Sequence, residues 1–111
     1  MSKVTFTFPD DCGGGELVLR EPTTQIEIDA EKAAKLHDSG EEGRAQELLK
    51  RCIVSALGKP MDWSTGNPEK LMDELGEKRR QLAMAAFNKA FMPTKEQKDA
   101  FLATMKMEVS E

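Results

Sequence analysis

The sequence is poor in aromatic side chains and in the residue types that catalytic and metal sites require. It has five Phe, one Trp and no Tyr, so the core of this 111-residue chain must consist mainly of Leu, Ile, Ala and Met. One His and two cysteines, Cys12 and Cys52, give no zinc-site spacing, and no C-x-x-C motif occurs. A disulfide between the two cysteines is conceivable but is not expected in a reducing compartment.

Long apolar runs and an excess of positive charge are also absent. No segment approaches the roughly 18 apolar residues of a membrane span, and MSKVTFTF lacks the apolar stretch of a signal peptide. The formal net charge is −4, and Lys78–Arg80 is the single basic cluster, expected on a solvated helix face. Because nucleic-acid binders present a basic face, we expect a protein partner and not a nucleic acid. Without a membrane span or a signal peptide, we expect a cytoplasmic protein that does not bind a membrane.

The first 22 residues predict a β-hairpin. Val4, Phe6 and Phe8 alternate with Thr5 and Thr7, as in a half-buried strand. The stretch PDDCGGG then interrupts the strand, and an extended apolar run resumes at residues 16–19. The three glycines do not predict a phosphate site, because neither Gly-Lys-Ser/Thr nor a helix start follows them.

Residues 23–107 predict a helical region that forms one compact unit, residues 3–107, with the hairpin. A first helix over 24–38 follows from the capping-box spacing of Thr24 and Glu27, although alternation over 25–29 leaves a third strand open. The second helix carries apolar residues at steps of three and four and stops at Gly58, with Pro60 just beyond. Its apolar stripe comprises Ala45, Leu48, Leu49, Cys52, Ile53, Ala56 and Leu57.

Two further helices complete the predicted fold. Asn67-Pro68 starts the longest, which runs to about Phe91 and contains Gly76, a weak point that permits a bend. The residues expected to face inward are Leu71, Leu75, Leu82, Ala86, Phe87 and Ala90. Thr94 to Gln97 has capping-box spacing and starts a last helix that ends near Met107. The fold class is therefore mostly α, an N-terminal β-hairpin followed by about four helices in one small domain.

Catalysis finds no support in the sequence. His37 falls at the polar end of the first helix, where a cation interacts favourably with the helix dipole, so we expect a surface or capping residue. Cys52 lies in an apolar stripe, as an inert core thiol does, and Cys12 has no evident base. Gly58-Lys59 is not a P-loop, because Pro60 replaces the required Ser or Thr. We predict no catalytic residue, cofactor or metal.

The residues with the strongest protein-binding character lie in a loop and at the C-terminal end. Trp63 could cover the core or anchor an interface, since Trp is enriched in binding hot spots. On the last helix, Phe101, Leu102 and Met105 share one side. We expect this helix to pack on the domain, with a Met-rich edge that binds a client or a second copy; simple core covering is the alternative. The candidate binding residues are Trp63, Met92, Phe101, Leu102, Met105 and Met107.

The order of these features resembles the tail assembly chaperones of long-tailed bacteriophages and prophages. The resemblance lies in residues 16–105: LVLREPT at 17–23, LMDELG at 71–76 with Ala86-Phe87, MPT at 92–94, and Phe101-Leu102. It implies a small, helical, cytoplasmic, non-enzymatic protein that keeps the tape measure protein soluble during tail assembly and is absent from the mature virion. It also implies that a longer, frameshifted product can accompany the chain.

Two other functions stay open at this point. A small helix-turn-helix regulator would use residues 47–57 as its recognition helix, although the mixed charges of that helix and the acidic chain count against it. A scaffold module of another bacterial complex is the second alternative.

Overall fold

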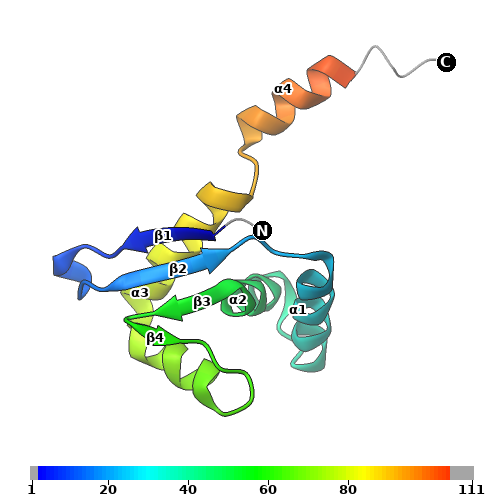
Figure 1. Cartoon of the computed structure of the whole chain (residues 1–111). Helices are drawn as coiled ribbons and strands as arrows, with labels where there is room; N and C mark the ends of the chain where they lie inside the picture. The colour runs from blue at the N-terminus through cyan, green and yellow to red at the C-terminus, as the bar shows by residue number, and fades with distance from the viewer. Residues whose placement is uncertain (1–2, 106–111) are drawn as a thin grey trace.

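The structure is a computed structural model that describes residues 3–105, in which helices cover one face of an antiparallel sheet (Figure 1). The sheet has four strands in the order β1-β2-β3-β4. The strands are β1 (Lys3–Thr7), β2 (Glu16–Arg20), β3 (Ile53–Ala56) and β4 (Lys59–Pro60). The helices are α1 (Thr24–Leu36), α2 (Gly40–Cys52), α3 (Asn67–Phe91) and α4 (Lys95–Met105), with a 3-10 turn η1 (Asp10–Cys12). The predicted mostly helical character and N-terminal hairpin are confirmed, whereas β3 and β4 were not predicted.

The hairpin forms because its apolar residues pair across the two strands on the same face. Val4 lies opposite Leu19 and Phe6 opposite Leu17, in antiparallel register. Leu17 and Leu19 are completely buried, and Phe8 extends the same apolar face beyond the end of β1. The opposite face carries pairs such as Thr5 and Val18. The alternation of apolar and polar residues along the two hairpin strands is typical of a sheet covered on one side.

The second helix is shorter than predicted, and this is the main correction to the sequence analysis. It ends at Cys52, and Ile53 begins strand β3, which pairs with β2. The β-branched pair Ile53-Val54 favours extended backbone, and β2 offers an unpaired edge. Leu57 and Gly58 then form a two-residue turn with φ values of 56° and 78°. Such a turn connects hairpin strands, so Gly58 marks a hairpin rather than a helix end.

The spacing of apolar residues predicted too long a second helix, because buried residues continue across the change from helix to strand. Ile53 and Ala56 are buried, as a helical stripe would require, but they belong to β3. The candidate recognition helix of a helix-turn-helix regulator at residues 47–57 is therefore not one helix.

The backbone of α1 is helical from Thr24 onward, so residues 25–29 do not form a third strand. The N-cap is Thr23, one residue earlier than predicted, and its Oγ1 accepts a hydrogen bond from the Ile26 amide at 3.2 Å. The helix ends at Leu36, with His37 as an exposed C-cap. Gly40 begins α2 three residues after His37, and α1 and α2 pack against each other.

The bend predicted at Gly76 is present in α3. Gly76 has φ 78° and ψ 168°, which interrupts the helix between two helical halves. The buried residues of the second half differ from the predicted set. Leu71, Leu75 and Phe87 are buried as predicted, but Ala83 is buried in place of Leu82, which is 38% exposed. Ala86 is only half-buried and Ala90 is exposed, which also corrects the prediction.

The core lies between the sheet and helices α2 and α3, which lie behind the sheet in Figure 1. Leu49 and Cys52 of α2 are completely buried there. As expected from the shortage of aromatics, aliphatic residues predominate, and Phe8 and Phe87 are the fully enclosed rings. The buried cluster comprises Phe8, Leu17, Leu19, Ala30, Leu48, Leu49, Cys52, Ile53, Ala56, Leu71, Met72, Leu75, Ala83 and Phe87.

The last helix starts as predicted but does not pack as predicted. Thr94 and Gln97 form a reciprocal capping box, with amide-to-side-chain distances of 3.0 and 2.8 Å. Yet every residue from Lys95 to Thr104 is exposed, and α4 projects away from the domain (Figure 1). The extended Met92 and the following Pro93 turn the chain away from the axis of α3. The expectation that α4 packs against the domain, or covers its core, is wrong.

Candidate protein-binding surfaces

The projecting helix α4 exposes two large apolar side chains. Phe101 is 63% exposed and Leu102 is 60% exposed. On the polar part of the helix, the Lys95 Nζ and Asp99 carboxylate form an ion pair at 2.9 Å. Met105 is the last residue of the helix, but its side chain lies outside the described part of the structure, as does the whole of Met107. The predicted Met-rich edge is therefore described only at Met92.

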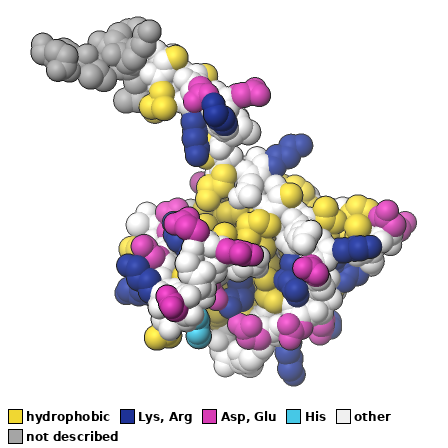
Figure 2. Space-filling view, turned by 180° about the vertical axis from the view of Figure 1, so that it is seen from behind, with side chains coloured by type: hydrophobic (Ala, Val, Ile, Leu, Met, Phe, Trp, Pro, Cys, Tyr) yellow, Lys and Arg dark blue, Asp and Glu magenta, His cyan; other side chains and the backbone are white. Residues whose placement is uncertain are grey.

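Met92 belongs to the edge of the domain rather than to the projecting helix. It is half-buried and packs against the core together with Phe91, whose ring meets that of Phe87 edge-on with centroids 5.6 Å apart. Figure 2 shows hydrophobic side chains at the surface where the projecting helix meets the domain. Met92 thus links the core to the base of α4.

Trp63 does not cover the core. Its side chain is 49% exposed, and it lies over two cationic side chains of α2. The Arg51 guanidinium carbon is 4.9 Å from the ring centroid, and the Lys50 Nζ is 5.8 Å from it. The loop that carries Trp63 is fixed by its neighbour Asp62, whose amide donates to Asn67 Oδ1 at 2.8 Å. Trp63 is thus a supported surface residue.

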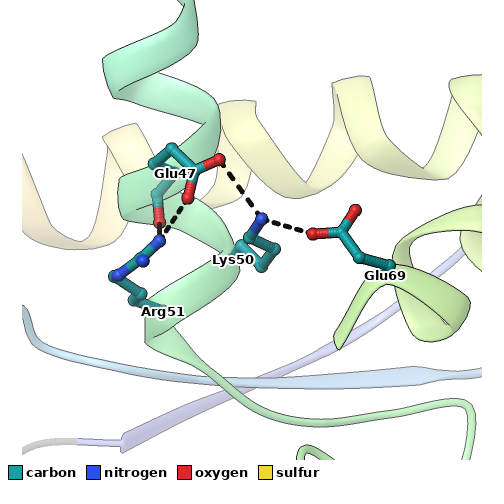
Figure 3. A network of polar contacts seen from close by, with 4 residues as sticks. All are labelled: Glu47, Lys50, Arg51 and Glu69. Carbon is teal, nitrogen blue, oxygen red and sulfur yellow. Dashed lines mark hydrogen bonds and ion pairs between the residues drawn. The ribbon is translucent and has the colours of Figure 1, made fainter. Parts of the chain in front are cut away.

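The cations beneath Trp63 belong to an ion-pair network (Figure 3). Lys50 is buried, and its Nζ donates to Glu47 Oε2 at 3.2 Å and to Glu69 Oε1 at 2.7 Å. The Arg51 guanidinium donates to the Glu47 carboxylate and to its backbone carbonyl. Burial raises the pKa of the Glu47 carboxyl, but hydrogen bonds from Arg51 and Lys50 outweigh it and hold this pKa below its ordinary value. The network fixes both cations against the indole ring.

A groove of about 670 Å³ separates α1 from Trp63. One wall is the outer face of α1, and the other consists of Arg20, Arg51 and Trp63. Leu36, at the end of α1, is 81% exposed beside it. The groove is lined on this side by the N-cap Thr23 and by the α1 residues Gln25, Ile26, Asp29, Lys32, Ala33 and Leu36. Only Trp63 of this set was predicted from the sequence, because the wall opposite α1 joins three segments that are distant in the chain.

The basic cluster Lys78–Arg80 was predicted to lie on a solvated helix face, and this is wrong for two of its three residues. Arg79 and Arg80 are half-buried, and both donate hydrogen bonds to backbone carbonyls near the bend in α3. Arg80 reaches the carbonyl of Met72 at 2.9 Å. Lys78 alone is exposed. Two of the three cations therefore serve the fold.

The titratable and nucleophilic residues are dispersed. Cys52 is buried, and burial raises the pKa of its thiol to about 11, so it is neutral near pH 7. Cys12 is half-buried and His37 is exposed. Within residues 3–105, no group of three or more His, Cys, Asp or Glu side chains is arranged to hold a metal ion. No helix in the same range has the length and apolar character needed to cross a membrane.

Comparisons of the chain with protein families, with curated proteins and with solved structures found no match.

Proposed function

We propose that this protein is a non-enzymatic tail assembly chaperone that binds the tape measure protein of a long-tailed phage or prophage. It acts in the cytoplasm of the host bacterium and is absent from the mature virion. The proposal rests on the resemblance of residues 16–105 to such chaperones. The single structural observation that supports it is the exposed apolar side of the projecting helix α4.

A projecting amphipathic helix suits a client that is itself long and apolar. Phe101 and Leu102 lose no core contacts when they bind a partner, because they are already exposed. Burial of two such side chains contributes about 1.5–3 kcal/mol each, which is enough for reversible holding but not for a permanent complex. Reversibility is required of a chaperone that must release its client for assembly.

Because Phe101 and Leu102 are exposed, they do not cover the core of this chain. An exposed Phe-Leu pair adds nothing to the stability of the domain and increases the tendency to aggregate. A binding role gives a physical reason for both residues. Self-association through the same helix is the competing use, and size-exclusion chromatography of the purified chain measures it.

The first test is the gene neighbourhood, in which tail-tube and tape-measure genes should lie beside the gene for this chain. The second is co-expression with that tape measure protein, comparing the wild type with the double variant Phe101→Ser, Leu102→Ser. We expect the variant to fold but to leave more tape measure protein in the pellet. The matched control, Glu96→Ser with Lys98→Ser, preserves net charge and should remain active.

Two outcomes would overturn the proposal. One is the absence of tail genes from the neighbourhood. The other is an apolar double variant that keeps the tape measure protein as soluble as the wild type does. Size-exclusion chromatography of the purified chain separates self-association from client binding, because a dimer that dissociates in the double variant would assign α4 to self-contact instead.

A further inference from the structure

We infer that the groove between α1 and Trp63 binds a peptide segment of a partner protein in which an acidic side chain lies next to apolar ones. This site is separate from α4, and the inference does not depend on the tail-chaperone proposal. Its evidence is the charge of the groove walls, a buried guanidinium donor without a partner, and exposed apolar side chains.

The walls of the groove carry a local excess of positive charge on an acidic protein. Arg20, Lys32 and Arg51 line the groove, whereas Asp29 is the one carboxylate in its lining. Gln25 Nε2 donates to Asp29 Oδ1 at 2.8 Å, which partly satisfies that carboxylate. The whole chain has a net charge of −4, so this excess is local. A cleft with an excess of one sign of charge attracts ligands of the opposite sign and orients them.

Arg20 has an unused hydrogen-bonding capacity. Its Nε is buried, and within the described part of the chain it has no hydrogen-bond partner. A buried donor of a charged group that lacks an acceptor is costly, so such groups are normally paired. Arg20 is one of the residues that line the groove. Guanidinium groups bind the planar, two-oxygen acceptor of a carboxylate best, so a ligand with a carboxylate suits this wall.

Apolar surface lies close to these cations. Trp63 is half-exposed and Leu36 is 81% exposed, and both line the groove together with Ile26 and Ala33. Trp and Arg are the residues most enriched at binding hot spots, since a Trp ring buries a large area at a small entropic cost. The ion-pair network holds Arg51 against Trp63 before any ligand arrives, which reduces the ordering cost of binding.

The geometry favours an extended peptide over other occupants. The lining residues of α1 run from Gln25 to Leu36, a rise of about 16 Å at 1.5 Å per residue, which matches roughly five residues of extended chain. A nucleic-acid strand would stack on Trp63, but its repeated phosphates would meet Asp29 and the negative charge of the whole protein. A peptide that alternates acidic and apolar side chains matches both kinds of wall.

Trp63 makes the test direct, because it is the only Trp and the chain has no Tyr. The full-length protein is titrated with the capped peptide Leu-Glu-Leu-Glu-Leu while Trp63 emission is recorded. The same titration uses Leu-Lys-Leu-Lys-Leu and a short single-stranded DNA. We expect saturable binding of the Glu peptide alone, weakened by added salt.

Three variants locate the binding. Arg20→Gln and Lys32→Gln should each weaken the Glu peptide by about tenfold or less, because each removes one charge partner. Lys89→Gln, an exposed residue of α3 outside the groove, loses the same charge and should bind as the wild type does. Circular dichroism confirms that each variant is folded; Lys32 is exposed, so its variant remains informative if Arg20→Gln unfolds.

Several results would overturn the inference. Equal binding of the Glu and Lys peptides would show that charge plays no part. Unchanged affinity in Lys32→Gln and in folded Arg20→Gln would place the peptide elsewhere. Tighter binding of DNA would make the groove a nucleic-acid site. Emission that changes with protein concentration alone would identify a second copy of the chain as the occupant.

Discussion

The side chain of Arg79 ties the glycine loop of the hairpin to the bend in α3. Its Nη2 donates to the carbonyl oxygen of Gly13 at 2.6 Å, across 66 positions of sequence. Its Nε donates to Gly14 at 3.1 Å, and Nη1 donates to Leu75 at 3.2 Å. The bend at Gly76 interrupts the hydrogen bonding of α3, so nearby carbonyls require other donors. One guanidinium thus fixes the loop and supplies donors at the bend.

Replacement of Arg79 by Gln should lower the free energy of unfolding by about 1.5–3 kcal/mol, the range for hydrogen bonds that involve a charged group. Urea denaturation followed by circular dichroism measures the change. Lys78→Gln removes the same charge from an exposed neighbour and should change stability by less than about 0.5 kcal/mol. Equal denaturation midpoints for the two variants would contradict the role assigned to Arg79.

Gly76 should tolerate alanine poorly because of its backbone rather than its surroundings. Nothing lies within 4 Å of a Cβ at this position, but the φ of 78° is unfavourable for any residue with a side chain. Gly76→Ala should therefore cost about 1–3 kcal/mol, measured by the same denaturation. Glu77→Ala, at the exposed neighbouring position of α3, is the control. If Gly76→Ala is as stable as Glu77→Ala, the bend is not held by its glycine.

Leu49 lies completely buried in the last turn of α2, in the core between the sheet and α3. Leu49→Ala should cost about 2–5 kcal/mol through lost burial and the cavity left behind, a large fraction of the 5–15 kcal/mol typical of a small domain. Leu36→Ala is the control, since Leu36 is 81% exposed and should melt at nearly the wild-type temperature. A small shift for Leu49→Ala would mean that α2 does not pack as described.

Local chemistry accounts for the parts of the fold that were predictable. The capping box at Thr94, the stop at Met92-Pro93 and the bend at Gly76 each follow from a few adjacent residues, and each is present. Strand β3 was not predictable in this way. Ile53 to Ala56 continue a helical pattern of apolar residues, and only the edge of β2, more than thirty positions away, makes the extended form preferable.

The two candidate surfaces also differ in whether adjacent residues or distant segments form them. Phe101 and Leu102 were predicted as binding residues from one short helix, and no other segment within residues 3–105 covers them. The groove was missed because two of its cations, Arg20 and Arg51, lie at the ends of two separate elements and meet Trp63 only in the folded chain. The face of α1 that forms the other wall was readable as a row of residues three and four apart, but nothing in that row indicated an open site.

The buried thiol of Cys52 should make stability fall at alkaline pH. Burial raises its pKa from 9.0 to about 11, so between these values the unfolded chain releases a proton that the folded chain retains. The unfolded state then binds fewer protons, and the free energy of unfolding decreases as pH rises from 9 to 11, by at most about 2.7 kcal/mol. Below pH 9 the contribution is fully present.

Denaturation of the wild type and of Cys52→Ala at pH 7.5, 9 and 10.5 isolates this effect, because other groups titrate equally in both proteins. The stability difference between them should shrink at high pH, where the wild type loses the contribution of its thiol. A difference that stays constant across the three values would show that the thiol is not buried.

Removal of α4 should leave the domain almost unchanged. A chain that ends after Pro93 loses residues that are exposed from Lys95 to Thr104, so no described core contact is removed. We expect the melting temperature to change by less than about 2 °C, since 1 kcal/mol corresponds to about 4–8 °C in a domain of this size. A chain that ends after Asn88 also loses Phe91 and Met92, which pack against the core, and should melt substantially lower.

If the Pro93 truncation melts as low as the Asn88 truncation, α4 contributes to the fold and its apolar side is not free for a partner. If only the chain that ends after Asn88 is destabilised, Phe101 and Leu102 are dispensable for folding. A loss of client solubility with the chain that ends after Pro93 is then a loss of binding.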